Sequence, residues 1–532
     1  MQFHKLSFAE TGQFSQLIVD YMEGQPELAK FYKYPPSLES YDRVISEKSM
    51  QDIDRETLVQ VLKDQYAGVA INDQVRDNIE ALRDSNTFTI TTAHQPVIGT
   101  GPLYMIIKIL AAINLAETLN EKYPDVRFVP VYWSGGEDHD FEEINHLHVF
   151  GKTVTWEAPA GGPVGRMSTE SMSDWVEELE AILGDHPNAS SWMKLITTSY
   201  RDQPTLAKAN FHIMHQLFQS YGLVVLSSDE PRLKALFSPI MEQELFAPKS
   251  PSLVAEKVAA LEKLGYHEQA HARDINLFYL MDEFRARITY NESRDRYEVV
   301  DTDIKFSEDT LRAELRDHPE RFSPNVILRP LFQESILPNL AYVGGGGELA
   351  YWMQYESLFE HYKVNFPMLV LRNSVMWLDK GAHKKRLQTE LTLHDLFRDV
   401  DELIKEYVKE HAKDELSLAP QKRALRDLFA EVVEMAVAID PTLEKPVKGE
   451  EQKTINSLEK LEAKLLRAEK HKFDTAVNQI RWIKNKVFPE GKLQERYDNI
   501  AMYWQKHGPA CITMLKEAIQ PLEDQFVIIE ED

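Results

Sequence analysis

The segment from Thr87 to Trp133 constrains the fold more than any other part of the chain. Its start (TFTITT) is rich in β-branched side chains, and its end (RFVPVYW) combines valines with aromatic residues. Between them, Pro102 precedes an apolar run that is too long for one strand, and proline suits the first turn of a helix because it lacks an N–H group. A strand, a helix and a second strand predict a parallel pair of strands covered by helices, which is the unit of an α/β sheet.

Three further segments continue this alternation of strands and helices. They are Leu223–Ser227, Val326–Arg329 and Met368–Arg372, and each is bounded by helical patterns. We therefore predict a doubly wound α/β sheet. Residues 151–323 interrupt the alternation with helical patterns and a hairpin, Arg285–Asn291 against Arg296–Val300, and we interpret them as an insertion into a core of residues 1–376.

The C-terminal part, residues 377–532, is predicted to be helical and to contain no further strand. One helix has an apolar face, ended by Pro441, that is formed by Leu425, Leu428, Val432, Met435 and Ile439. A short coiled-coil seam is indicated by apolar residues three or four apart among Glu and Lys, namely Leu458, Leu461, Leu465 and Ala468. This stripe is too short to decide between a hairpin within one chain and a contact between two chains.

Composition limits the kinds of partner. The 532 residues carry a formal net charge of −25, which repels a phosphate backbone, so no nucleic acid is expected as a partner. The single cysteine, Cys511, allows no intramolecular disulfide and no Cys-rich zinc site. The N-terminus lacks a signal-peptide pattern, and the most apolar window, Val97–Ala116, contains Lys108 and Asn114. We expect a cytoplasmic protein without a membrane span.

The turn after the first predicted strand is the first candidate site. His94 and Gln95 lie between that strand and its helix, where ligands of open α/β sheets bind. A helix N-terminus there presents free N–H groups to an anion, and Gly99 and Gly101 would let the backbone approach a ligand closely. The alternative is a Gly-Pro turn beside a histidine without a chemical role, since neither the Rossmann nor the Walker spacing of glycines is present.

The second candidate is the acidic segment after the second predicted strand. Glu137, Asp138, His139 and Asp140 follow a buried strand directly, and polar side chains in that position need solvent or a ligand. Side chains of these types bind a metal or a substrate amine, with one carboxylate as a general base. The alternative is a solvated acidic loop that caps the next helix.

The third candidate combines Arg329 with the glycine run Gly344–Gly347 and with Glu348. An arginine at the end of a strand binds a carboxylate or phosphate through two N–H groups. A glycine run before a helix forms a backbone nest for an anion. The alternative is a flexible loop beside a surface arginine.

One motif match is discounted. His267-Glu-Gln-Ala-His271 fits the H-E-x-x-H pattern of zinc proteases, which requires both histidines in one long helix. Gly265, just before it, is typical of a helix C-cap, and no helical apolar face follows. We therefore expect no zinc site in this segment.

Four motifs in this order resemble one family. They are HQPVIGTGPLY (residues 94–104), VYWSGGEDHDFEEIN (131–145), NVILRPLFQE (325–334) and the glycine run before GELAYW (347–352). Over about residues 90–375 the chain is similar to the cysteine-adding family of bacillithiol biosynthesis, BshC, and its helical C-terminal part fits that family in kind. The resemblance implies a Rossmann-like core similar to class I nucleotidyltransferases. It also implies connecting-peptide insertions and a C-terminal α-helical coiled-coil domain that forms a homodimer.

The activity that the resemblance implies is that of a carbon–nitrogen ligase, which joins L-cysteine to glucosaminyl-malate in the last step of bacillithiol biosynthesis. His94 then stands where a HIGH-type motif begins, so ATP or another nucleotide is expected, although the chain has no KMSKS-like lysine loop. No metal or prosthetic group is expected. The candidate catalytic residues are His94, Asp138, His139 and Asp140. The candidates for binding substrate or nucleotide are Gln95, Gly99, Thr100, Gly101, Trp133, Glu137, Asn145, Arg329, Gln333, Gly345, Gly346 and Glu348.

Two functions of other classes remain open. One is a metal-dependent hydrolase that uses Asp138, His139 and Asp140 as ligands. The other is a catalytically idle nucleotide-binding protein that assembles through the coiled coil. Metal analysis of the purified protein tests the first, and thiol biosynthesis in a strain with alanine at positions 138 and 139 tests the second.

Overall fold

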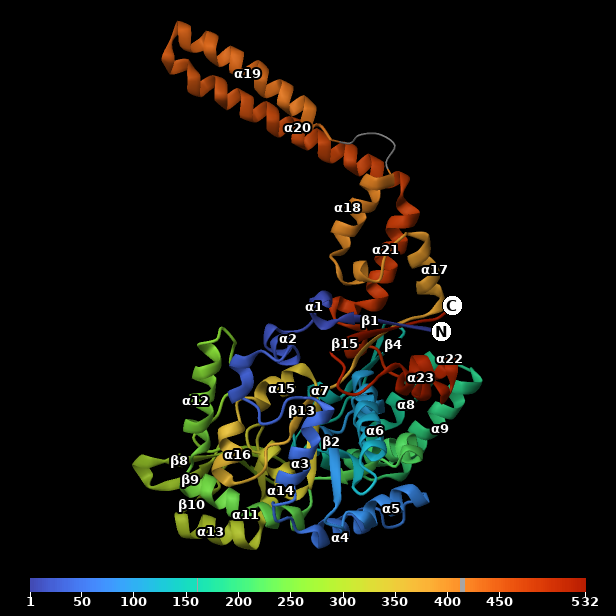
Figure 1. Ribbon diagram of the computed structural model, residues 1–532, viewed down its shortest axis with the longest axis vertical. Coiled ribbons are helices and arrows are strands. Elements are labelled where there is room, and N and C mark those ends of the chain that lie inside the picture. The colour runs from blue at the N-terminus through green and yellow to red at the C-terminus, as the bar shows by residue number, and fades with distance from the viewer. Residues whose placement is uncertain (160, 412–416) are drawn as a thin grey trace. The chain divides into compact units, whose positions relative to one another are not determined.

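The computed structural model describes residues 1–159, 161–411 and 417–532 (Figure 1). The chain forms two compact units, one of residues 3–376 and 492–529 and the other of residues 1–2, 377–491 and 530–532. Residues 492–529 thus belong to the first unit although they follow the helical part of the chain. Among the helices of the described ranges, none is both long and apolar enough to cross a lipid bilayer.

A five-stranded parallel sheet forms the centre of the first unit (Figure 1). Its strands lie in the order β13 (Met368–Leu371), β12 (Asn339–Gly344), β2 (Thr87–His94), β3 (Arg127–Ser134) and β6 (Val224–Ser227). The chain starts in the middle of this sheet, adds two strands on one side and then two on the other, which is a doubly wound arrangement. The predicted doubly wound, Rossmann-like sheet is therefore confirmed.

Helix α6 (Tyr104–Lys122) connects β2 to β3 and packs on both strands. All of its side chains from Met105 to Ala116 are buried, which explains the apolar window of the sequence. The register of the parallel pair places His94 opposite Ser134, the last residues of β2 and β3. The side chains that follow the two strands therefore meet at one edge of the sheet.

The inserted region forms a second, antiparallel sheet in the same unit. Its order is β10 (Lys305–Phe306), β9 (Arg296–Val299), β8 (Arg285–Asn291), β7 (Leu277–Leu280) and β11 (Phe322–Pro324). Strands β8 and β9 are the predicted hairpin, and Asn291 pairs with Arg296. This sheet brings residues of the insertion to the carboxyl edge of the central sheet, as the lining of the cavity described below shows.

The prediction of a strand at Val326–Arg329 is wrong. The segment is a turn that leads into helix α14 (Arg329–Ile336). The Asn325 side chain accepts a hydrogen bond from the backbone N–H of Ile327 at 2.9 Å, which stabilises the turn, and Pro330 fits the first turn of the helix. The strand of the central sheet that the sequence did not predict is β12, which is buried over its whole length and ends at the glycine run.

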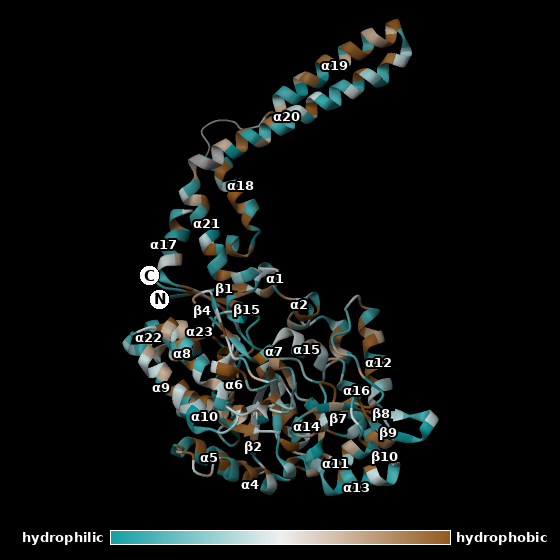
Figure 2. Cartoon of the chain, turned by 180° about the vertical axis from the view of Figure 1, so that it is seen from behind, coloured by the Kyte–Doolittle hydropathy of each residue, from teal (hydrophilic) through white to brown (hydrophobic). Residues whose placement is uncertain are grey.

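The second unit contains α17 (Lys380–Gln388), α18 (Val400–His411), α19 (Ala419–Ile439), α20 (Glu444–Lys472) and α21 (Asp474–Val487). Helices α19 and α20 pack as a hairpin, with Ala436 and Ile455 buried and an ion pair of 2.6 Å between Lys422 and Glu462. The predicted coiled coil is confirmed and is a hairpin within one chain. Leu461 and Leu465 of the predicted seam are nevertheless 47% and 42% exposed, and Figure 2 shows hydrophobic residues along both helices.

The prediction that no strand follows residue 376 is also wrong. Strand β15 (Gln525–Glu530) lies in a three-stranded sheet of order β1 (Gln2–Ser7), β15 and β14 (Ser374–Leu378). Its run of Val527, Ile528 and Ile529 is buried. The other two strands of the described chain are β4 (His146–Val149) and β5 (Lys152–Thr155). The other helices are α1 (Phe8–Thr11), α2 (Gln16–Met22), α3 (Tyr41–Lys48), α4 (Arg55–Gln65), α5 (Asp73–Ala81), α7 (Phe141–Ile144), α8 (Ser173–Leu183), α9 (Pro187–Asp202), α10 (Leu206–Phe218), α11 (Pro231–Phe246), α12 (Ser250–Glu262), α13 (Glu308–Asp317), α15 (Gly346–Trp352), α16 (Glu356–Tyr362), α22 (Ala501–His507) and α23 (Ala510–Ala518).

Candidate active site

A cavity of about 920 Å³ lies at the carboxyl ends of the central strands, within the first unit. Residues that end or follow each of the five strands line it, which is where ligands of open α/β sheets bind. The predicted site residues in its lining are His94, Gln95, Trp133, Glu137, Asp138, Arg329, Gly345, Gly346 and Glu348. The three candidate segments of the sequence therefore do converge on one cavity.

The lining of the cavity is rich in positive charge. Its cationic side chains are Arg273, Arg285, Arg287, Arg329, Arg372, Lys492 and Arg496, and its acidic side chains are Glu137, Asp138, Glu143 and Glu348. The whole chain has a net charge of −25, so this local excess of cations runs against its composition. Such a lining attracts carboxylate or phosphate groups.

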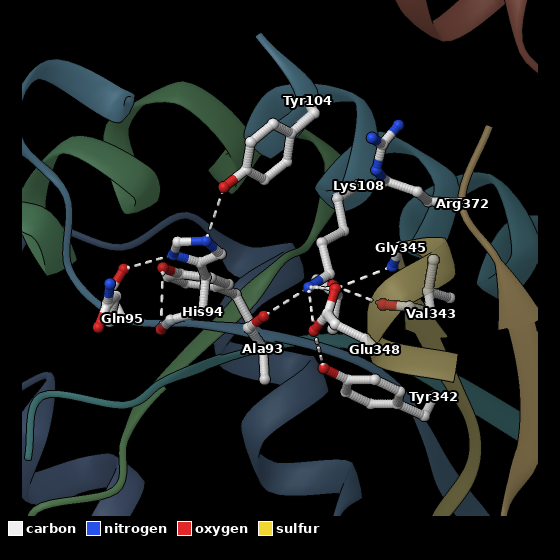
Figure 3. Close-up of polar contacts among 12 residues, drawn as sticks. Ala93, His94, Gln95, Tyr104, Lys108, Tyr342, Val343, Gly345, Glu348 and Arg372 are labelled. Carbon is white, nitrogen blue, oxygen red and sulfur yellow. Dashed lines mark hydrogen bonds and ion pairs between the residues drawn. The ribbon is translucent and has the colours of Figure 1, made fainter. Parts of the chain in front are cut away.

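His94 ends β2 and is held through both ring nitrogens (Figure 3). Its Nδ1 lies 2.9 Å from the carbonyl oxygen of Gln95, and its Nε2 lies 2.9 Å from the hydroxyl oxygen of Tyr104. Burial, followed by the nearby Lys108 ammonium, lowers the pKa of His94 to about 4. The imidazole is therefore neutral at neutral pH.

A buried ion pair lies beside His94 (Figure 3). Nζ of Lys108, on α6, lies 2.8 and 2.6 Å from the two carboxylate oxygens of Glu348 and donates to the carbonyl oxygen of Ala93 at 2.6 Å. Glu348 also accepts hydrogen bonds from the hydroxyl of Tyr342 and from the backbone N–H of Gly345. Burial alone would raise the pKa of Glu348, but Lys108 and the Gly345 N–H outweigh it and lower that pKa to about 2. The carboxylate is thus ionised and engaged by the protein itself.

Arg329 begins helix α14 and lies in the lining of the cavity. Its NH1 nitrogen donates to Oε1 of Gln333 at 3.1 Å, so Gln333 orients the guanidinium without lining the cavity. Its NH2 nitrogen is buried and has no hydrogen-bond partner within the described residues. Because the Arg329 side chain lines the cavity, its guanidinium charge suits an anionic ligand there.

The acidic segment after β3 is held by two cationic side chains that the sequence did not single out. Lys234, fully buried on α11, lies 2.8 Å from a carboxylate oxygen of Glu137. Arg285, on β8 of the insertion, lies 3.3 Å from both Oδ1 of Asp138 and Nδ1 of His139.

The charge of Asp138 is fixed by these neighbours. Burial would raise its pKa, but hydrogen bonds from His139 and the charge of Arg285 lower it to about 2. His139 and Asp140 are exposed and do not line the cavity. Of the acidic segment, the cavity therefore meets Glu137 and Asp138.

The turn glycines serve packing rather than ligand approach. Gly99, Thr100 and Gly101 are buried outside the lining, and Nδ2 of Asn499 donates to the carbonyl oxygens of Gly99 and Gly101 at 2.8 and 2.6 Å. A Cβ atom at Gly99 would lie 2.5 Å from Cδ2 of Leu147. Asn145 is likewise outside the lining, where its side chain is 3.1 Å from Nδ1 of His146.

The segment that matches the zinc-protease pattern is not helical. Residues 267–273 contain no helix, as predicted, and Nδ1 of His271 lies 3.1 Å from a carboxylate oxygen of Glu268. Across the described ranges, no group of three or more His, Cys, Asp or Glu side chains is arranged to hold a metal ion. The geometry therefore gives no support to Asp138, His139 and Asp140 as a ligand set.

Tyr104, Lys108, Lys234 and Arg285 contact the predicted site residues and are among those missed as candidates. Tyr104 ends the first motif, whereas the other three lie far along the chain from the carboxylates they pair with, Glu348, Glu137 and Asp138. Lys108 and Tyr104 are on α6, Lys234 is on α11 and Arg285 is on β8. One signal was available, because a lone lysine inside an apolar helix needs a buried partner. The partners themselves depend on the packing of helices and insertion, which the sequence does not display.

Comparison with known proteins agrees with this fold. Residues 1–373 match the family described as "Bacillithiol biosynthesis BshC, N-terminal Rossmann-like domain". Residues 375–531 match "Bacillithiol biosynthesis BshC, C-terminal coiled-coil domain". The chain therefore belongs to the BshC family of bacillithiol biosynthesis.

Similar proteins that carry the name "Putative cysteine ligase BshC" extend over the whole chain. The protein from Flavobacterium johnsoniae is 40% identical over 526 residues, which cover 98% of this chain and 99% of the relative. The protein from Christiangramia forsetii is 40% identical over 530 residues, 98% of each chain. The protein from Salinibacter ruber is 31% identical over 532 residues, 97% of this chain and 96% of the relative. The family is thus one of ligases by the names of its members.

Proposed function

We propose that the protein joins the carboxyl group of L-cysteine to the amine of glucosaminyl-malate in an amide bond, the last step of bacillithiol biosynthesis. The names of the relatives support a ligase that acts on cysteine. The observation that carries the second substrate is Arg329, which lines a cation-rich cavity and forms no salt bridge among the described residues. A malate group brings two carboxylates, which arginine binds through charge-assisted hydrogen bonds.

Asp138 is the side chain best suited to the ammonium group of cysteine. Its carboxylate is ionised, with a pKa of about 2, and its side chain is 47% exposed at the cavity. Glu137 and Glu348 are less suited, because they are less exposed and pair with lysines at 2.8 and 2.6 Å. Arg285 also pairs with Asp138, but at the longer distance of 3.3 Å. In this proposal His139 and Asp140 do not contact the substrate.

Amide formation from a free carboxylate requires activation, and we propose that ATP or another nucleotide supplies it by placing a phosphate leaving group on the cysteine carboxyl group. Lys492 and Arg496 in the lining are the side chains suited to its phosphates. Arg372 also lines the cavity, but its side chain is 5% exposed and its NH2 nitrogen pairs with Glu495 at 2.8 Å. Nε of Arg372 would lie 3.7 Å from a Cβ atom at Gly345, so this arginine reaches the glycine run. No metal or prosthetic group of the protein itself is part of this proposal.

The test is a reaction of the purified chain with cysteine, glucosaminyl-malate and ATP, followed by mass spectrometry of the thiol product. We expect product only when all three are present. Arg329→Met should raise KM for glucosaminyl-malate about 10- to 100-fold, which corresponds to the loss of a charge-assisted hydrogen bond. Arg316→Met removes an exposed arginine of α13 and should leave KM unchanged. No product with the wild-type chain, or equal KM values for both variants, would contradict the proposal.

A homodimer through the coiled-coil hairpin is proposed as the working form. Leu461 and Leu465 remain exposed on the hairpin, so a second copy would cover apolar surface that one chain leaves open. We also propose the cytoplasm as its location, where ATP and cysteine are available. Neither a hydrolase nor an idle assembly protein is favoured by any specific contact of the site.

A further inference from the structure

Tyr104 shares a hydrogen bond with His94 at the edge of the cavity (Figure 3). Nε2 of His94 lies 2.9 Å from the hydroxyl oxygen of Tyr104, and Nδ1 lies 2.9 Å from the carbonyl oxygen of Gln95. A carbonyl oxygen only accepts, so the ring proton of neutral His94 is on Nδ1 and Nε2 carries a lone pair. The Tyr104 hydroxyl therefore donates its proton to Nε2, and the lone pairs of its own oxygen stay available.

The side chain of Tyr104 lines the cavity. In the part of the chain that the structure describes, Nε2 of His94 is the one hydrogen-bond partner of its oxygen. The residue is well fixed, because it is the first residue of α6 and the guanidinium of Arg372 lies over its ring, 5.2 Å from the centroid. Burial raises the pKa of Tyr104 to about 12, so the phenol keeps its proton at neutral pH.

We propose that Tyr104 is a catalytic residue that accepts the proton of the attacking amine on its oxygen while it passes its own proton to Nε2 of His94. This inference rests on the proposed ligase function. The amine nitrogen of the aminosugar attacks the carbonyl carbon of a cysteinyl group that carries a phosphate leaving group. A C–N bond forms, an N–H bond breaks, and the C–O bond to the phosphate breaks with its electron pair on the phosphate oxygen.

The proton is accounted for at each atom of this relay. It leaves nitrogen for the oxygen of Tyr104, the phenolic proton moves to Nε2 of His94, and the resulting imidazolium returns a proton through Tyr104 to the released phosphate or to water. Lys108 disfavours the imidazolium, whereas Glu348 and Asp138 favour it. A weakly basic imidazole takes a proton only after the amine has bonded to carbon and become strongly acidic, which couples proton transfer to bond formation.

The relay is tested with Tyr104→Phe, which keeps the ring and removes the hydroxyl group. We expect kcat for amide formation to fall about 100-fold or more, the usual contribution of a positioned acid or base, while KM for both substrates changes less than about threefold. Hydroxylamine is a nucleophile that is largely unprotonated at neutral pH and needs no base. With cysteine and ATP, Tyr104→Phe should therefore form cysteinyl hydroxamate at nearly the wild-type rate.

Tyr132→Phe is the matched control, because Tyr132 is fully buried on β3, donates to the backbone oxygen of His94 at 3.4 Å and does not line the cavity. Its kcat should stay within about twofold of wild type. Two groups that act as one relay are not additive, so Tyr104→Phe should cost little further rate in a His94→Gln background.

The outcomes are separable. A wild-type chain that forms no amide product refutes the proposed function itself. If wild type is active, near-normal amide formation by Tyr104→Phe overturns the relay. Equal loss of amide and hydroxamate formation overturns it as well, because Tyr104 would then act in folding or in activation. Additive losses in the double variant would show that Tyr104 and His94 act separately.

Discussion

Replacing Lys108 with methionine removes one partner of the ion pair beside His94 and leaves the other in place. The lysine side chain is 1% exposed and that of Glu348 is 26% exposed, so the carboxylate would remain largely buried without its main cation. Its pKa of about 2 lies below the ordinary value of 4.5. At 1.36 kcal/mol per unit, this shift corresponds to roughly 3 kcal/mol of stabilisation of the ionised form.

The cost of breaking buried ion pairs in other proteins gives a second estimate of this free energy, and the two agree. Removing one member of a buried ion pair costs about 3–5 kcal/mol, and the partial exposure of Glu348 favours the lower end. The first unit has about 410 residues, and an unfolding entropy of about 2.1 cal/mol/K per residue then gives about 0.9 kcal/mol/K. We therefore expect Lys108→Met to lower the Tm of this unit by about 3–4 °C.

The assay is differential scanning calorimetry at neutral pH, with two comparison variants. Lys108→Met combined with Glu348→Gln removes the unpaired charge and should recover part of the lost stability. Lys122→Met changes an exposed lysine at the end of the same helix and should shift the Tm by less than 1 °C. The reasoning is refuted if Lys108→Met behaves like Lys122→Met, or if the double variant is as unstable as the sum of the single ones.

Three other changes test separate parts of the molecule. Gly99→Ala puts a Cβ atom on a residue with φ of +53° and within 2.5 Å of Leu147. We expect its free energy of unfolding, measured with denaturant, to fall by about 2 kcal/mol. Gly151→Ala, with φ of +73° and open space around it, should lose only the part of that free energy that comes from backbone strain. The double variant Leu461→Glu, Leu465→Glu should sediment as a monomer and still form the amide product. Leu387→Glu changes an exposed leucine of α17 and should leave the dimer intact. A wild-type chain that sediments as a monomer would disprove the dimer. Lys108→Met should also raise the pKa of His94, because the Lys108 ammonium helps to lower it. The acid limb of the pH profile of kcat/KM should then move to higher pH. If the limb does not move, it does not report the titration of His94.

The sequence predicts the fold wherever a β-branched run is bounded by turn residues. Strands β2, β3, β6 and β13 have this pattern, and each was located to within a few residues. Val326–Arg329 shows the same composition, but the Asn325 turn and Pro330 convert it to the start of a helix. Strand β12 was not predicted because its apolar part is short and its last residue, Gly344, belongs to the glycine run, which is typical of a loop. Local backbone chemistry thus overrides composition at these two places.

The candidate site was predictable in place but not in chemistry. Parallel strands bring their carboxyl ends to one edge, so motifs that follow β2, β3 and β12 had to meet there. The cationic partner of each carboxylate was not predictable from the sequence. Lys108 is on the crossover helix α6, Lys234 is on the distant helix α11, and Arg285 is on β8 of the insertion. These contacts arise only when the elements pack.

The cations Lys108, Lys234 and Arg285 also determine the net charge that the cavity presents to a ligand. Glu348 pairs with Lys108, Glu137 with Lys234 and Asp138 with Arg285, so most of the acidity in the conspicuous motifs is already balanced within the protein. Arg329 has no acidic partner among the salt bridges of the described chain, and its NH2 nitrogen lacks any hydrogen bond there. The cavity therefore presents net positive charge although the motifs that mark it in the sequence are acidic. A substrate with carboxylates fits such a cavity, and a substrate recognised only through its amines does not.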